Sequence, residues 1–132
     1  MILADSSVWI NHFRRNDSNL SRLLNQEQIV IHPCIIGELA LGQLKHRNQI
    51  IHDLQRLPQV SSAADSEILE WIEIRRMFGK GIGWVDAHVL LSCILNEAEL
   101  WTVDKPLASA AHYCGARLYG QVGLVKRLHG VR

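Results

Sequence analysis

Four of the thirteen acidic residues lie among apolar neighbours rather than in polar stretches: Asp5, Glu38, Asp86 and Asp104. Burying a carboxylate without a partner costs several kcal/mol, so such groups are normally hydrogen-bonded, paired with a cation or bound to a metal. The sequence places no Arg or Lys close to Asp86, and near Glu38 only Lys45 has helical spacing. The four acids are therefore candidate metal ligands.

A ligand set made only of carboxylate oxygens favours hard cations, and Mg²⁺ or Mn²⁺ is the usual choice beside a phosphate. Such an ion can polarise a phosphoryl oxygen and lower the pKa of a bound water, so the chemistry indicated is phosphodiester hydrolysis. Metal-bound water, rather than a histidine, would act as the base. We expect His32 at the surface or in a turn, and His88 to point away from Asp86, because residues i and i+2 of a helix do not face each other.

Each acid also has an interpretation that involves no catalysis. Asp5 could cap a helix, Asp86 could complement the dipole of another helix from its first turn, and Asp104 could precede a third helix cap. Glu38 is harder to explain in this way, because it lies one turn into an apolar helix, where the dipole helps little. These interpretations stay open beside the metal-binding one.

The predicted strands would bring two of the acids together. Residues 1–4 and 100–103 are short apolar runs typical of buried strands, and Asp5 and Asp104 directly follow them. In open parallel sheets, ligands bind beyond the carboxyl ends of the strands. The two acids would therefore face one crevice.

Two predicted helices carry the other acids. The first covers 33–44, with Pro33 in its first turn, and the second covers 84–96 and is the most apolar of the chain. Glu38 falls in the first half of one helix and Asp86 opens the other. Both could point to the same end of the sheet if the helices pack alongside it.

The rest of the chain alternates strands with helices. Further helices are predicted from Ser7 and over 20–24, 48–57, 65–78 and 106–113, and further strands over 29–31, 59–60 and 117–119. Because parallel strands need crossovers of a dozen or more residues, this order indicates an α/β fold with a mostly parallel sheet covered by helices on both faces. A length of 132 residues fits a single domain over 1–132.

The composition is that of an ordinary globular protein, with 48% hydrophobic and 20% charged residues. No basic leader or long apolar run is present, so we expect a soluble cytoplasmic protein without a membrane segment. The cysteines, Cys34, Cys93 and Cys114, lack any close pair, which predicts neither a disulfide framework nor a zinc site.

A net charge of +1 argues against binding nucleic acid through a strong overall positive field. Local basic clusters do occur, at 14–15, at 45–47, at Arg75, Arg76 and Lys80, and at 126–127. Each could line a phosphate track, and each could equally be a solvated helix face.

Four segments resemble the PIN-domain family and, within it, the VapC toxins of toxin–antitoxin pairs. They are residues 1–10 (MILADSSVWI), 35–42 (IIGELALG), 83–91 (GWVDAHVLL) and 100–105 (LWTVDK), in the family's order and approximate spacing. The resemblance spans nearly the whole chain. It departs from many members at Ser6, where they have Thr, and at Pro106, where some have a further acid.

The resemblance implies a PIN-like three-layer α/β/α sandwich and a Mg²⁺- or Mn²⁺-dependent endoribonuclease. It also implies a homodimer inhibited by a cognate VapB-type antitoxin that covers the acidic groove. The implied metal-binding and catalytic residues are Asp5, Glu38, Asp86 and Asp104, supported through hydrogen bonds by Ser6 or Thr102. Contacts to the RNA backbone are expected at Arg75, Arg76 and Lys80, and Trp84 could either stack on a base or belong to the core.

Three alternatives to this prediction differ from it in identifiable residues or contacts. A phosphoacceptor receiver-like signalling module would also be α/β with a Lys-Pro pair such as Lys105-Pro106, but its mid-chain acceptor would have to be Asp53, which lies in a polar helical stretch. A catalytically silent nucleic-acid-binding PIN domain would lack one or more of the acids, and all four are present. DNA could replace RNA as the substrate, since only contacts to the 2′-hydroxyl distinguish them; the family favours RNA.

Overall fold

The computed structural model describes residues 1–120, so the basic pair predicted at 126–127 lies outside the described residues. Its sheet contains β1 (Ile2–Ala4), β2 (Ile29–Val30) and β3 (Glu99–Trp101), in the order β2-β1-β3. Both pairings of β1 are parallel. The predicted α/β class with a parallel sheet is therefore confirmed.

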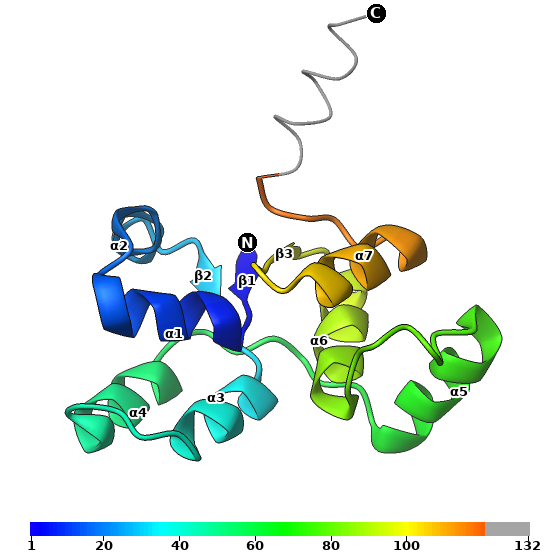
Figure 1. The fold of residues 1–132 in the computed structure, drawn as a ribbon, viewed down its shortest axis with the longest axis horizontal. Coiled ribbons are helices and arrows are strands. Elements are labelled where there is room, and N and C mark those ends of the chain that lie inside the picture. The colour runs from blue at the N-terminus through cyan, green and yellow to red at the C-terminus, as the bar shows by residue number, and fades with distance from the viewer. Residues whose placement is uncertain (121–132) are drawn as a thin grey trace, which may run out of the picture.

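Helices flank the sheet on both sides. They are α1 (Ser6–Arg15), α2 (Ser18–Asn25), α3 (Pro33–Ala40), α4 (Arg47–Gln55), α5 (Asp65–Arg75), α6 (Trp84–Leu95) and α7 (Lys105–Cys114). Figure 1 shows α1 to α4 on one side of the strands and α5 to α7 on the other. This arrangement explains why β1 is apolar without alternation, because a strand covered on both faces has no solvent side.

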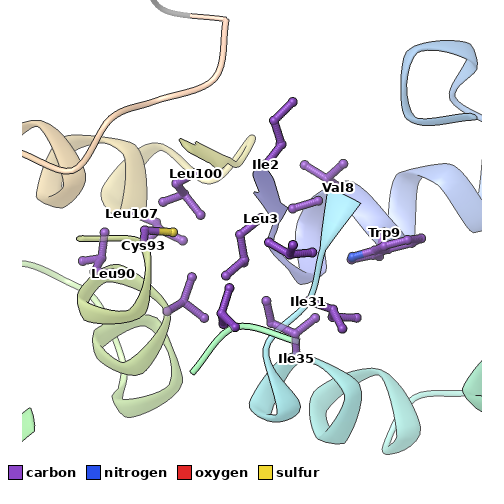
Figure 2. Close-up of a cluster of buried hydrophobic side chains, with 14 of the residues drawn as sticks. Ile2, Leu3, Val8, Trp9, Ile31, Ile35, Leu90, Cys93, Leu100 and Leu107 are labelled. Carbon is purple, nitrogen blue, oxygen red and sulfur yellow. The ribbon is translucent and has the colours of Figure 1, made fainter. Parts of the chain in front are cut away.

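The core is centred on β1. Leu3 is fully buried, and Leu100 of β3 pairs with it in register. Side chains from both groups of helices converge there: Figure 2 shows Leu90 of α6 on one side of Leu3 and Ile35 of α3 on the other. Burial of each such side chain contributes about 1.5–3 kcal/mol relative to exposure, so this cluster fixes the position of the strand ends.

Several boundaries differ from the sequence prediction. The helix expected to reach residue 44 ends at Ala40, and Leu41 beyond it is 90% exposed, so its apolar character does not mark a buried turn. The strands expected at 59–60 and 117–119 are single bridges, Ile31 to Gln59 and Leu100 to Leu118.

The loop of residues 76–83 begins earlier than expected. Helix α5 ends at Arg75 rather than at 78, and Arg76 adopts a left-handed conformation with φ of 52° that stops the helix. Gly79 and Gly81, with φ of 72° and 75°, continue in the region that favours glycine. Within residues 1–120, no helix is both long enough and apolar enough to cross a membrane.

Candidate metal centre

The four predicted acids surround one hollow of about 190 Å³. Its lining is Asp5, Ser6, Ser7, Ile35, Glu38, Val85, Asp86, Val89 and Asp104. The structure thus brings together residues that are up to 99 positions apart in the sequence, from Asp5 to Asp104. The predicted RNA-contacting residues Arg75, Arg76 and Lys80 do not line this hollow.

Asp5 lies at the junction of β1 and α1. One carboxylate oxygen, Oδ1, accepts hydrogen bonds from the Ser7 amide at 3.1 Å, the Val8 amide at 3.4 Å and the Ser7 hydroxyl at 2.5 Å. The other, Oδ2, accepts from the Thr102 hydroxyl at 2.6 Å. Asp5 therefore caps α1 and lines the hollow at the same time, so the capping interpretation does not exclude metal binding.

Asp5 is the one buried member of the quartet, with 7% of its surface exposed. Burial raises the pKa of its carboxyl above the ordinary value, and the hydrogen bonds from Ser7, Thr102 and Val8 oppose this effect only in part. Asp86 is half-buried, and Glu38 and Asp104 are exposed. Glu38 and Asp104 are thus exposed although their neighbours in the sequence are apolar, because both residues line the open hollow rather than the core.

Thr102 connects two of the acids. Its hydroxyl donates to Asp5 and accepts a hydrogen bond of 3.0 Å from the backbone amide of Asp104. Asp104 is the N-cap of α7, and its Oδ1 accepts from the Leu107 amide at 3.2 Å. Strand β3 ends at Trp101, two residues earlier than the predicted strand, so the chain turns toward α1, where the Val103 amide donates to the Ser7 hydroxyl at 3.2 Å.

Ser7 was not among the predicted site residues. Its hydroxyl donates to Asp5 and accepts from the Val103 amide, so it connects Asp5 to the segment after β3. The capping potential of the Asp5-Ser6-Ser7 sequence was the available signal, but the partner 96 residues away could not be read from it.

Glu38 and Asp86 each have one hydrogen-bond partner among the described residues. Glu38 Oε1 accepts from the Ser6 hydroxyl at 2.6 Å, so Ser6 contacts one of the four acids. Asp86 Oδ2 accepts from the Gly83 amide at 3.1 Å, at the start of α6. One oxygen of each carboxylate is left for another ligand.

The charge balance of the hollow fits a divalent cation. Among residues 1–120 the one ion pair within 4.0 Å is between His88 and Asp65, so no Lys or Arg compensates the four carboxylates. The positive ends of α1, α6 and α7 also point to this region, since Asp5 and Asp104 are N-caps and Asp86 is in a first turn. These ends favour the carboxylates and would equally favour a phosphate.

The spacing of the carboxylates suits an ion that keeps water ligands. Among residues 1–120, no three of the four side chains each place a carboxylate oxygen within 4.8 Å of the others. Mg²⁺ is commonly held by one or two carboxylates together with water and phosphate oxygens, so it does not require a tighter group.

Comparison with known proteins places the chain in a family. The PIN domain family model matches residues 2–113. The chain belongs to the PIN-domain family. Among its relatives is Ribonuclease VapC32 of Mycobacterium tuberculosis, found in two strains, which is 41% identical over 123 residues, or 92% of this chain and 99% of the relative.

The fold agrees with this membership. The crystal structure of PAE2754 from Pyrobaculum aerophilum superposes with a TM-score of 0.60, covering 83% of each chain at 15% identity. At that identity the likeness concerns the fold alone. The predicted PIN-like α/β architecture is confirmed by both comparisons.

This PIN domain also contains a buried histidine network that sequence reasoning missed. His32 is 1% exposed, so its expected position at the surface was wrong. Its Nδ1 accepts from the Cys34 amide at 2.9 Å and its Nε2 lies 3.3 Å from the Ser62 hydroxyl, while His88 Nε2 lies 3.2 Å from the Asp65 carboxylate. Burial, and secondarily the nearby His88, lowers the pKa of His32 to about 4.

His32, Cys34 and His88 offer ligand atoms within 4.8 Å of one another. The Cys34 amide, however, occupies the Nδ1 lone pair of His32, so the neutral ring carries its proton on Nε2 and retains no lone pair for an ion. Its hydrogen bonds and burial identify the network as a support that joins the start of α3 to α5 and α6.

Proposed function

We propose that this PIN domain is a metal-dependent endoribonuclease that hydrolyses RNA phosphodiester bonds with Mg²⁺ or Mn²⁺. The observation that carries the proposal is the group of four carboxylates, Asp5, Glu38, Asp86 and Asp104, around one hollow, with no Lys or Arg within 4.0 Å of them among residues 1–120. The 41% identity to a ribonuclease over nearly the full length of both chains supports RNA as the substrate.

The chain's own residues perform the positioning. Ser7 and Thr102 hold both oxygens of Asp5 in place, and Ser6 holds Glu38. The N-terminus of α7 beside Asp104 presents backbone amides that favour a phosphate group. When bound, a divalent ion supplies Lewis-acid polarisation of the phosphoryl oxygen and a water of lowered pKa.

Two partners follow from the family resemblance. The first is a cognate VapB-type antitoxin, which would neutralise the enzyme. The second is another copy of this chain, with which it would form a cytoplasmic homodimer. A hollow of about 640 Å³ supports a protein partner, because it combines the apolar Phe13 and Ile50 with the basic Arg14 and Lys45. It lies on α1, the helix that Asp5 caps, so a partner seated there could extend to the carboxylates.

A receiver-like module has little support. Asp53, its mid-chain acceptor candidate, lies on α4, where its carboxylate accepts from the Gln49 side chain at 2.8 Å, and it does not line the acidic hollow. A silent nucleic-acid-binding domain is tested directly by the enzymatic experiment.

The test is cleavage of mixed tRNA and ribosomal RNA by purified protein with Mg²⁺, with Mn²⁺ and with chelator. We expect discrete fragments that require metal, and a rate that falls in Asp86→Asn by more than the roughly 10- to 100-fold typical of residues that only support a ligand. Asp53→Asn is the matched control and should cleave like the wild type. Absence of cleavage by folded, antitoxin-free protein would overturn the proposal.

A further inference from the structure

A second hollow lies beside the acidic one, on the loop that leads into α6. Its volume is about 170 Å³, and its lining is Ile72, Met77, Phe78, Gly79, Ile82, Gly83, Trp84 and Ala87. Phe78 and Trp84 are 60% and 43% exposed, which is unusual for large aromatic side chains without a partner. The lining is otherwise apolar, and the glycines leave its rim without side chains.

This loop also contacts a residue of the acidic site. The Gly83 amide donates to Asp86, and a Cβ placed on Gly81 would lie 3.7 Å from Pro106, two residues after Asp104. Trp84 and Asp86 project from different sides of α6, because residues two positions apart do not face each other, so Gly83 is the link between the two hollows. The two hollows therefore meet at the N-terminus of α6, where Gly83 of the second hollow contacts Asp86 of the first.

Trp84 is held in one orientation before any ligand arrives. Its ring packs edge-on against the buried ring of His88, with 4.9 Å between centroids at an angle of 84°. His88 is itself fixed by Asp65, at 3.2 Å. The histidine network thus presents a preorganised aromatic surface, which lowers the entropy lost on binding.

The charges around the loop match a polyanion. Lys80 lies on the loop with its Nζ 3.5 Å from the centre of the Tyr113 ring, and Arg75 Nη2 reaches the Cys114 carbonyl at 3.5 Å. Arg76 is exposed at the end of α5. An apolar aromatic hollow bordered by cations suits one class of ligand in particular, a base of single-stranded RNA with its phosphates outside.

We propose that Trp84 and Phe78 bind a nucleobase adjacent to the scissile phosphate, so that Trp84 is a substrate-positioning residue of this PIN domain. Lys80 and Arg76 contact the phosphates that flank this base. This inference rests on the proposed ribonuclease function and adds to it the site at which a base, rather than the backbone, is recognised.

The test compares a short single-stranded RNA with an abasic ribose-phosphate strand of the same length. Binding is measured by fluorescence anisotropy in a Glu38→Gln background, with strand integrity checked on gels. We expect the parent to bind the base-bearing strand about 5- to 150-fold more tightly than the abasic one, the range for stacking of one base. Trp84→Leu should lose most of this preference, Trp84→Phe should retain part of it, and Lys80→Gln should weaken both strands equally.

Leu95→Ala is the matched control, because Leu95 is an exposed apolar residue at the opposite end of α6. In otherwise wild-type enzyme, Trp84→Leu should raise KM with kcat within about twofold of the parent. Unchanged discrimination in Trp84→Leu, while the wild type cleaves RNA, would overturn the inference alone; absent cleavage by the wild type would overturn the proposed function. A change in oligomeric state with unchanged RNA binding would assign the hollow to a protein contact instead.

Discussion

Replacement of Thr102 by valine is the most direct test of how the acidic site is held. The change keeps the side-chain shape and removes only the hydroxyl, which donates to Asp5 at 2.6 Å and accepts from the Asp104 amide at 3.0 Å. Hydrogen bonds to charged groups contribute about 1.5–3 kcal/mol, and Thr102 is only half-buried, so we expect the unfolding free energy to fall by about 1–2 kcal/mol.

The larger expected effect of Thr102→Val is on the metal. Because the hydroxyl is one of the groups that lower the pKa of Asp5, its loss raises that pKa further and disfavours the ionised ligand. Loss of a group that orients a ligand weakens metal affinity by about 10- to 100-fold. The Mg²⁺ concentration for half-maximal RNA cleavage should rise by a similar factor.

Thr102→Ser is the matched variant, since it retains the hydroxyl and loses only a methyl group. We expect its Mg²⁺ requirement to stay within a few-fold of the wild type. Urea denaturation of all three proteins without metal separates the loss of stability from the loss of affinity. An unchanged Mg²⁺ requirement in Thr102→Val would refute the argument that this hydroxyl positions Asp5 and Asp104.

Three further predictions concern charge, metal and core. Because burial raises the pKa of Asp5, the folded state binds its proton more tightly than the unfolded chain, and this group's contribution to stability falls as pH rises through the folded pKa. The stability of metal-free Asp5→Asn relative to the wild type, measured by urea denaturation, should therefore rise as the pH increases from the ordinary carboxyl pKa of 3.8 through the raised folded-state pKa, and a relative fall would contradict this. Mg²⁺ at about 100 times its dissociation constant should add about 2.7 kcal/mol to the unfolding free energy; Glu38→Gln should need more Mg²⁺ for the same gain, whereas Glu73→Gln on the exposed surface of α5 should not. Leu100→Ala, at a fully buried position, should cost about 2–5 kcal/mol and Leu69→Ala, at 57% exposure, less than about 0.5 kcal/mol, and similar losses at both sites would exclude the core described here.

Local sequence was sufficient to predict most of the elements. Residues 1–4 and 29–31 were recognisable as buried strands because β1 and β2 are covered on both sides and contain no solvent-facing polar residue. The starts of α1 and α7 were predictable to within one residue, because their caps bond to amides only two or three residues away; Asp5 caps α1 as considered, whereas Asp104 is itself the cap of α7 rather than the residue before it. Helix ends were less predictable: Leu41 is apolar yet exposed, so its hydrophobicity carried no information about packing.

For the acidic site too, some features were predictable from the sequence and others were not. The sequence by itself determined which acids were candidates, because carboxylates beside apolar strands and helices need a partner. Only the tertiary structure decided that Asp5, Glu38, Asp86 and Asp104 line one hollow, that Ser7 and Thr102 join its two halves, and that His32 is buried. The physical reason is distance along the chain, since the contact from Thr102 to Asp5 joins residues 97 positions apart. It exists because β3 pairs with β1, and the register of this pairing depends on the packing of the core rather than on any local sequence pattern.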